Sequence, residues 1–293
     1  MAAASITRYE GASIVASDIR ATLHFWVDFV GGQLIDEGSP DGRLPWRVDI
    51  SGSAMEIYAA AAGQQPSPGA TNQHYCWDIE PTDFDRWVER GKLWQMRPKS
   101  ISAHHNGLEL SLYWDDPDGY HFEVAAHYCT DHELRKTREA RMGAFRELMA
   151  LPQGPFTIET MPSTLSAPAS IGLMNHFTMA APDVEAAMNF WMDFLGADWY
   201  SESDRLDQVL LGGVLVDLFP PVDDAAEPAP GGLSQRFRFA VPADSISDWI
   251  EKAQDWRVPT SLSEERELHR HVLVVEAPGG YHVGLEAQLD GHG

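Results

Sequence analysis

The 293-residue sequence is poor in cysteine and in basic residues. Its two cysteines, Cys76 and Cys129, are too few for a disulfide framework, and neither belongs to a C-x-x-C pair of the zinc or thioredoxin-like kind. We therefore expect a reducing, cytoplasmic location. Lys and Arg number 21 against 44 Asp and Glu, a formal charge of −23, which disfavours binding to nucleic acid or to an anionic membrane surface.

The sequence also lacks long apolar runs and several catalytic motifs. No run approaches the ~18 residues that a transmembrane helix requires, and the first residues do not read as a signal peptide. There is no GxxxxGK[ST] loop, no GxSxG elbow and no HExxH helix, so nucleotide hydrolysis, esterase and zincin chemistry have no support. What remains is an ordinary globular composition, with a length that favours two domains.

An internal repeat organises the chain. Three pairs of segments match between its halves: 17–32 with 182–197, 48–58 with 209–219, and 115–121 with 276–282. Each half divides again, because a strand-like run, a capped helix and three further strand-like runs recur twice within it. The sequence therefore predicts four βαβββ modules.

The modules group into two predicted domains. Residues 1–128 are expected to form the first two-module domain and residues 171–293 the second, joined by a helical linker over 129–170. Thr130 and Glu133 form a capping box that predicts the start of the linker helix.

This pattern resembles the vicinal oxygen chelate superfamily, in which paired βαβββ modules curl into half-open barrels around a metal. The resemblance covers nearly the whole chain and implies an α+β fold with two half-open β-barrels. It also implies that the first and fourth strands of paired modules supply the metal ligands. The repeat alignment nominates first-strand and fourth-strand positions, respectively Gly11, His74, His176 and Arg236, and Glu56, Glu123, Asp217 and Gly284.

Only one complete ligand set survives, because Gly and Arg cannot bind a metal in such a place. If the second and third modules share a barrel, the ligands are His74, His176 and Glu123. Pairing within each half would instead leave His74 with Glu56 and Glu123 in the first half. We prefer the cross-half pairing, which completes a two-histidine, one-carboxylate face and predicts one metal per chain. Asp217 is then either a fourth ligand or a residue next to the ligands. Its side chain is one methylene shorter than that of glutamate, which favours a position next to the ligands.

Segment 104–124 resembles the part of type I extradiol ring-cleavage dioxygenases in which a histidine, a serine, a tyrosine and the glutamate ligand follow at fixed spacing. His104 stands nine residues before Tyr113, which stands ten before the glutamate. The resemblance implies that the histidine exchanges protons with a catechol, for which an ordinary pKa of about 6.5 is suited. Tyr113, on one strand face with Ser111, is expected to donate a hydrogen bond to the substrate. His105 is an equally placed alternative for the proton-transfer role.

The resemblance further implies Fe(II), or else Mn(II) or another divalent metal, with a small aromatic diol and O₂ as substrates and a homodimer as the assembly. Two other functions remain open on this scaffold: a glyoxalase-like, metal-dependent isomerase or lyase, and a metal-free small-molecule binding protein of the resistance kind. Ten tryptophans would suit a binding pocket, although Trp26 and Trp191 lie on helix faces typical of a core. Glu56 belongs to the incomplete ligand set, and we expect its loss to have little effect on turnover.

Overall fold

The computed structural model describes residues 4–68, 73–104, 108–152, 156, 162, 169–200, 207–220 and 235–289. Its elements follow the predicted order βαβββ four times. The first module consists of β1 (Arg8–Ala16), α1 (Ile19–Leu23), β2 (Gln33–Asp36), β3 (Trp46–Ile50) and β4 (Ser53–Ala59). The second consists of β5 (Tyr75–Ile79), α2 (Phe84–Leu93), β6 (Ser100–His104), β7 (Glu109–Asp115) and β8 (His121–His127).

The second half repeats this order. The third module consists of β9 (Met174–Ala180), α4 (Val184–Asn189), β10 (Asp198–Trp199), β11 (Asp207–Leu211) and β12 (Val214–Phe219). The fourth consists of β13 (Gln235–Ala240), α5 (Ile246–Trp256), β14 (Thr260–Glu265), β15 (Arg270–Ala277) and β16 (Tyr281–Gln288). Helix α3 (Asp131–Met149) joins the halves and begins where the capping box predicted, with the Thr130 hydroxyl accepting a hydrogen bond from the Glu133 N–H.

The repeated Phe-Trp segments take the same conformation in both halves. Asp18 and Asp183 begin α1 and α4, each accepting a hydrogen bond from the backbone N–H three residues further on. Each helix then widens into a π-helical turn, over His24–Phe29 and Phe190–Phe194 respectively. The repeat thus fixes where each helix begins and how it ends.

The tryptophans form the core. Seven of the ten are fully buried, namely Trp26, Trp77, Trp87, Trp94, Trp114, Trp191 and Trp249. Trp26 packs on the Phe122 ring of β8, and Trp191 packs on the Phe177 ring of β9, so the helices are fastened to the sheets by aromatic contacts. These side chains are therefore not available to line an open binding pocket.

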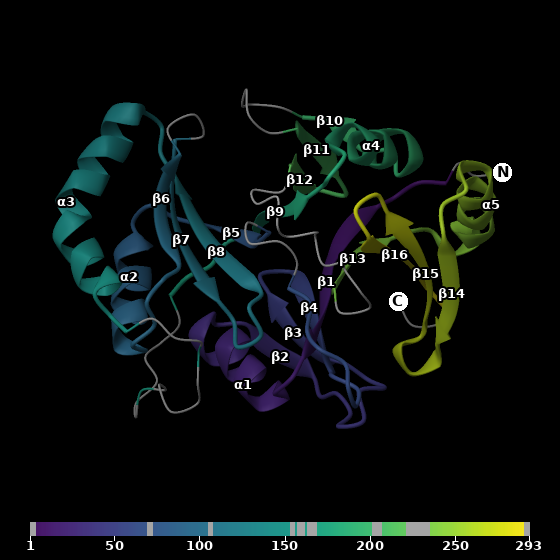
Figure 1. Ribbon diagram of the computed structural model, residues 1–293, viewed down its shortest axis with the longest axis horizontal. Helices are drawn as coiled ribbons and strands as arrows, with labels where there is room; N and C mark the ends of the chain where they lie inside the picture. Colours follow the sequence, from purple (N-terminus) through teal and green to yellow (C-terminus); the bar gives the residue numbers. More distant parts are fainter. Residues whose placement is uncertain are drawn as a thin grey trace.

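The strands form two eight-stranded mixed sheets, and each sheet takes one module from each half of the chain (Figure 1). Sheet A has the order β14-β15-β16-β13-β1-β4-β3-β2 and joins the first and fourth modules. Sheet B has the order β10-β11-β12-β9-β5-β8-β7-β6 and joins the second and third. The antiparallel pairs β1–β13 and β5–β9 connect the modules. The cross-half pairing preferred from the ligand count is the observed one.

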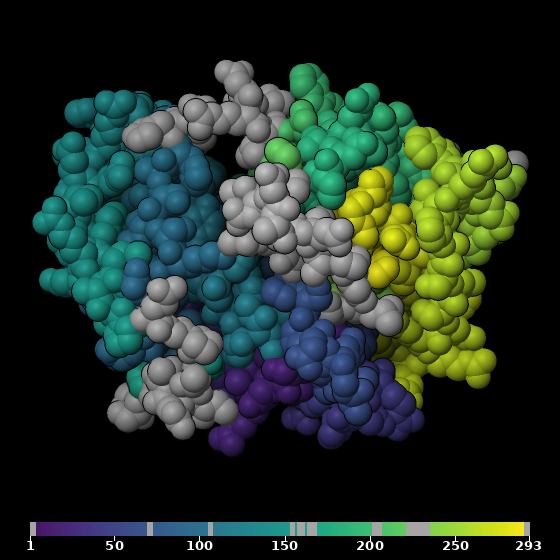
Figure 2. All heavy atoms as spheres, viewed as in Figure 1, coloured from purple at the N-terminus to yellow at the C-terminus, as the bar shows by residue number. Residues whose placement is uncertain are grey.

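Buried tyrosines connect the two sheets within each half. The Tyr120 hydroxyl donates to the Val15 carbonyl at 3.2 Å, and the Tyr281 hydroxyl donates to the Ala180 carbonyl at 2.8 Å. Both tyrosines belong to the repeated Gly-Tyr-His motif. In the space-filling view the first module, in dark blue and purple, lies against the yellow fourth module although the two are far apart in sequence (Figure 2). Among the described residues, no helix is long and apolar enough to cross a membrane.

Candidate metal centre

The strands of sheet B bring the three predicted ligands to one point. His74 directly precedes β5, Glu123 lies on β8 and His176 on β9. Cys76 of β5 is in register with both Glu123 and His176, so the ligands come from three adjacent strands. Because side chains alternate between the faces of a strand, His74 lies on the same face as Cys76. The imidazole and carboxylate donors therefore converge on one side of the sheet.

The donor atoms are close enough to share one ion. The Nε2 atom of His74 lies 2.7 Å from Oε2 of Glu123 and 3.1 Å from Nε2 of His176. The second histidine Nε2 lies 3.6 Å from the same glutamate oxygen. The three donor atoms all lie within 4.8 Å of one another. Two imidazoles and one carboxylate with open positions beside them are typical of non-haem Fe(II) sites.

Both histidines are oriented from their other ring nitrogen. Nδ1 of His176 lies 2.8 Å from Oδ1 of Asn175, whose amide donates in turn to Asp78 at 2.9 Å. Nδ1 of His74 lies 3.1 Å from the Thr178 hydroxyl. A partner at Nδ1 directs Nε2 toward the centre and is the usual support of a metal-bound histidine.

The carboxylate of Glu123 fits a cation in this place. Its side chain is buried, and no donor of the described residues meets either of its oxygens in hydrogen-bonding geometry. Burial raises the pKa of this group, but the charge of His74, the close approach of both imidazoles and the charge of His176 outweigh burial and lower it well below its usual range. A buried, ionised carboxylate is costly unless a charge compensates it. The donor set and its setting therefore suit a divalent metal.

Asp217 lies next to the three-atom cluster but outside it. Its Oδ2 is 3.9 Å from Nε2 of His176, and its Oδ1 accepts a hydrogen bond from Gln208 at 2.9 Å. Burial lowers the pKa of His176, whereas the carboxylates of Asp217, Glu123 and Glu109 raise it to about 10. Asp217 thus adds negative charge to the centre while one of its oxygens is held by an amide.

The predicted proton-transfer pair is close in space. His104 is exposed at the end of β6, and its Nε2 lies 3.3 Å from the Tyr113 hydroxyl. Tyr113 is in register with Glu123 across β7 and β8, and its ring packs edge-on against His74 at 5.3 Å between centroids. The alternative residue, His105, lies outside the described residues. The spacing of segment 104–124 thus brings a histidine and a tyrosine beside the ligands.

Glu109 is a site residue that the sequence reasoning missed. It follows the pattern of β7, in which Glu109, Ser111 and Tyr113 alternate on one face, and this alternation was the available signal. The Ser111 hydroxyl donates a short hydrogen bond to its carboxylate, so Ser111 is engaged within the protein. Burial, and then the charge of Glu123, raise the pKa of Glu109.

In sheet A the equivalent place cannot hold a metal. Gly11 has a φ of +135°, and a Cβ atom there would lie 1.9 Å from the Ala54 carbonyl oxygen, so no histidine can stand at that position. Glu56 is instead buried between two guanidinium groups. Arg238 and Arg270 each approach its Oε1 to 2.7 Å. Burial raises the pKa of Glu56, but the arginine charges outweigh burial and lower it to about 2. Glu56 is therefore the centre of an ion network and has a structural role in sheet A, while the expected small effect of its loss on turnover stays a prediction.

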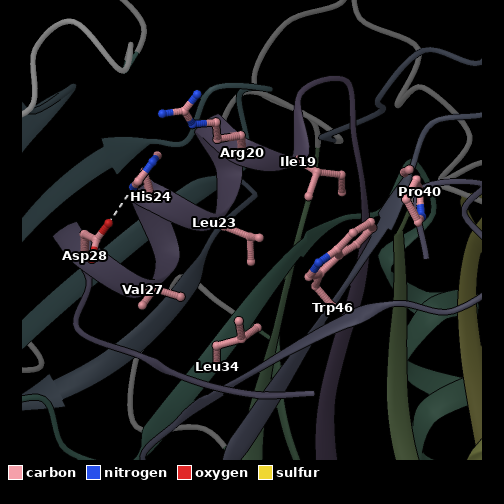
Figure 3. Close-up of a pocket in the computed structure, with 10 residues that line it drawn as sticks. Ile19, Arg20, Leu23, His24, Val27, Asp28, Leu34, Pro40 and Trp46 are labelled. Atoms are coloured by element: carbon pink, nitrogen blue, oxygen red, sulfur yellow. Dashed lines mark hydrogen bonds and ion pairs between the residues drawn. The ribbon is translucent and has the colours of Figure 1, made fainter. Parts of the chain in front are cut away.

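A cavity of about 530 Å³ lies elsewhere, between α1 and the strands β2 and β3 (Figure 3). Its walls are mostly apolar side chains with one His–Asp pair: Ile19, Leu23, Val27, Leu34, Trp46, His24 and Asp28. None of the residues that line it belongs to the metal centre, so it has no part in the chemistry proposed below.

Four βαβββ modules in two mixed sheets, with candidate ligands on the first and fourth strands, define the vicinal oxygen chelate fold. Solved structures with this arrangement include a candidate dioxygenase from Bacillus subtilis, with a TM-score of 0.67 at 10% identity over 99% of this chain and 87% of that one. Glyoxalase I from Zea mays has a TM-score of 0.63 at 13% identity, over 96% of this chain and 92% of that one. No protein family and no curated protein matches the sequence. The likeness shows the fold.

Proposed function

We propose that this protein is a metal-dependent extradiol dioxygenase that opens a catechol-type ring with O₂. The observation that carries the proposal is the three-donor face of His74, His176 and Glu123, with the His104–Tyr113 pair beside it. Fe(II) is the proposed metal, with Mn(II) or another divalent ion as the alternative. When bound, such an ion supplies coordination positions for an aromatic diol and O₂ together and the electron transfer that lets O₂ react with the ring.

The side chains around the centre have defined proposed tasks. His104 takes a proton from a substrate hydroxyl and later donates a proton as the ring-opened product forms. Tyr113 donates a hydrogen bond to a substrate oxygen and positions the ring. Glu109, which accepts a hydrogen bond from the Ser111 hydroxyl, adds negative charge that favours a cation. Both oxygen atoms of O₂ end in the ring-opened semialdehyde product, so no further reductant is required.

A glyoxalase-like isomerase or lyase is the second candidate, because Asp217 lies 3.9 Å from His176 and would complete a four-ligand set after a small movement. The fold of Zea mays glyoxalase I is consistent with either reaction. A metal-free binding protein has less support, because the tryptophans that would line its pocket are buried in the core.

The test is anaerobic purification without chelator, metal analysis, and an assay with catechols in air. A dioxygenase gives one metal per chain, consumption of O₂ and a yellow ring-cleavage product. Bound metal without O₂ consumption, together with turnover of a thiol hemiacetal, would favour the isomerase. A protein that retains no metal under these conditions contradicts both.

A further inference from the structure

Sheet A contains a second cavity, at the place that corresponds to the metal centre of sheet B. Its volume is about 280 Å³. The residues that matter for its chemistry come from β1, β4 and the strands of the fourth module: Ser13, Tyr58, Arg236, Glu265, Val274 and His282.

The strand registers establish the correspondence between the cavity and the candidate catalytic cleft. In both sheets a serine or threonine on the first strand of one module is paired with the candidate-ligand position on the first strand of the other module. Within the other module, the candidate-ligand position on the fourth strand is in register with a residue of the third strand. The equivalent pairs are Ser13–Arg236 with Thr178–His74, Gly284–Val274 with Glu123–Tyr113, and Arg270–Glu265 with Glu109–His104. The cavity is therefore the same cleft in the other sheet, with different side chains.

Arg236 takes the space that a metal ligand would need. A Cβ atom at Gly284 would lie 3.0 Å from Cδ of Arg236, so the missing side chain leaves room for the arginine. The backbone at Gly11 leaves no space for a side chain. The two glycines therefore remove two ligand positions from sheet A, and Arg236 occupies the space beside Gly284. The cleft that carries the candidate metal ligands in sheet B thus presents a fixed positive group in sheet A.

Arg236 forms no close ion pair with the described residues, although the charges of Glu56 and Glu286 act on it at longer range. Its Nε is buried, and no acceptor of the described residues forms a hydrogen bond with it. The nearest carboxylate, Glu265, lies 3.8 Å from a terminal nitrogen, and Glu265 is already held by Arg270 at 2.7 Å. The other acidic residue at the cavity, Asp41, is engaged by the Ser39 hydroxyl and by Arg43. Arg236 lines the cavity with part of its side chain exposed, so its terminal nitrogens have room for an anionic acceptor.

We propose that this cavity binds a small carboxylic acid with an apolar body. The planar guanidinium of Arg236 matches a carboxylate with two parallel hydrogen bonds. His282 lies in register with Arg236 on the neighbouring strand and places a second donor beside it. Val15, Val274 and Ala59 give part of the cavity an apolar wall, which suits a hydrocarbon body, beside the polar side chains of Ser13 and Tyr58. The volume of about 280 Å³ is just below the usual range for ligand pockets, so the proposed ligand is no larger than a single-ring acid.

This site contains no metal ligand and is independent of the proposed function. The test is therefore made on full-length protein treated with chelator, by calorimetric titration with benzoate and with its neutral counterpart benzamide. We expect one benzoate per chain and at least tenfold weaker binding of benzamide, because a charge-assisted pair is lost. The His176→Ala variant should bind benzoate as the unmodified protein does, which separates this cavity from the candidate metal centre.

Two variants examine the cavity itself. Arg236→Met should weaken benzoate binding at least tenfold, whereas Arg266→Met, a matched change of an exposed arginine, should leave it unchanged. Val274→Phe fills the cavity without touching the arginine and should abolish binding while the thermal midpoint stays near that of the parent. The proposal is overturned if millimolar benzoate gives no heat of binding. It is equally overturned if benzamide binds as tightly as benzoate, or if both cavity variants bind benzoate normally.

Discussion

Replacing Glu56 by glutamine is expected to destabilise the protein through sheet A. The carboxylate is not exposed, and Arg238 and Arg270 approach its Oε1 to 2.7 Å, with a second contact from Arg270 to Oε2 at 2.9 Å. Glutamine keeps the shape of the side chain but removes its charge. Arg238 and Arg270 then share Glu286, at 3.3 and 2.9 Å, and Arg270 alone keeps a further carboxylate, Glu265, at 2.7 Å.

Two arguments give the magnitude of this loss. Removing one partner of a buried ion pair costs about 3–5 kcal/mol, because an uncompensated charge stays behind. Independently, Arg238 and Arg270 overcome the effect of burial and lower the pKa of Glu56 from 4.5 to about 2. That difference corresponds to about 3 kcal/mol of stabilisation near neutral pH. We expect Glu56→Gln to lower the free energy of unfolding by about 3 kcal/mol.

Urea unfolding followed by tryptophan fluorescence measures this change. Because the pKa of Glu56 is lowered by folding, its contribution is complete above pH 4.5 and disappears as the pH falls toward 2. The difference between parent and variant should therefore shrink in acid. Glu264→Gln, which removes an exposed pair with Arg266, is the control and should cost less than about 1 kcal/mol. A Glu56→Gln effect as small as the control, or one that is the same at both ends of the pH range, would refute the reasoning.

The remaining predictions concern the candidate metal centre. His176→Ala should lose most of the bound metal in elemental analysis, and a variant that keeps one metal per chain would contradict the ligand set. Asp217→Ala should keep the metal and measurable ring cleavage, since this residue lies outside the three-atom cluster; complete metal loss would favour the four-ligand isomerase. His104→Phe should keep the metal and lower turnover about 100- to 10,000-fold, the usual range for general acid–base catalysis. If His105→Phe collapses turnover and His104→Phe does not, the proton-transfer role belongs to the later histidine.

Local features of this chain were predictable because they depend on neighbouring residues. The capping box at Thr130 and Glu133 placed the start of α3, and the repeated Asp and Phe-Trp positions placed α1 and α4. The candidate ligand positions followed from the repeat together with the family resemblance, which implies that the first and fourth strands supply the ligands. Copies of one module keep the same strand register, so aligned residues occupy equivalent places on their sheets.

The alternation of side chains along β7 also indicates where Glu109 lies. Glu109 shares a strand face with Ser111 and Tyr113, and its place beside the centre follows from that pattern once the strand is known. Its ionisation does not follow from the pattern, because burial and the charge of Glu123 raise its pKa only after the sheet has formed.

The sequence by itself determined the four modules and their elements, because hydrophobic period and capping are properties of neighbouring residues. Its internal repeat, read with the family resemblance, nominated the candidate ligands. Only the tertiary structure decided that the second and third modules share a sheet, since backbone hydrogen bonds between strands are the same whichever strands pair. The tertiary structure also decided that the equivalent cleft in sheet A lacks a metal-ligand set. The backbone at Gly11 excludes a ligand, while Arg238 and Arg270, from strands far along the chain, neutralise Glu56. Charge compensation between distant residues depends on distance in space, which no local pattern contains.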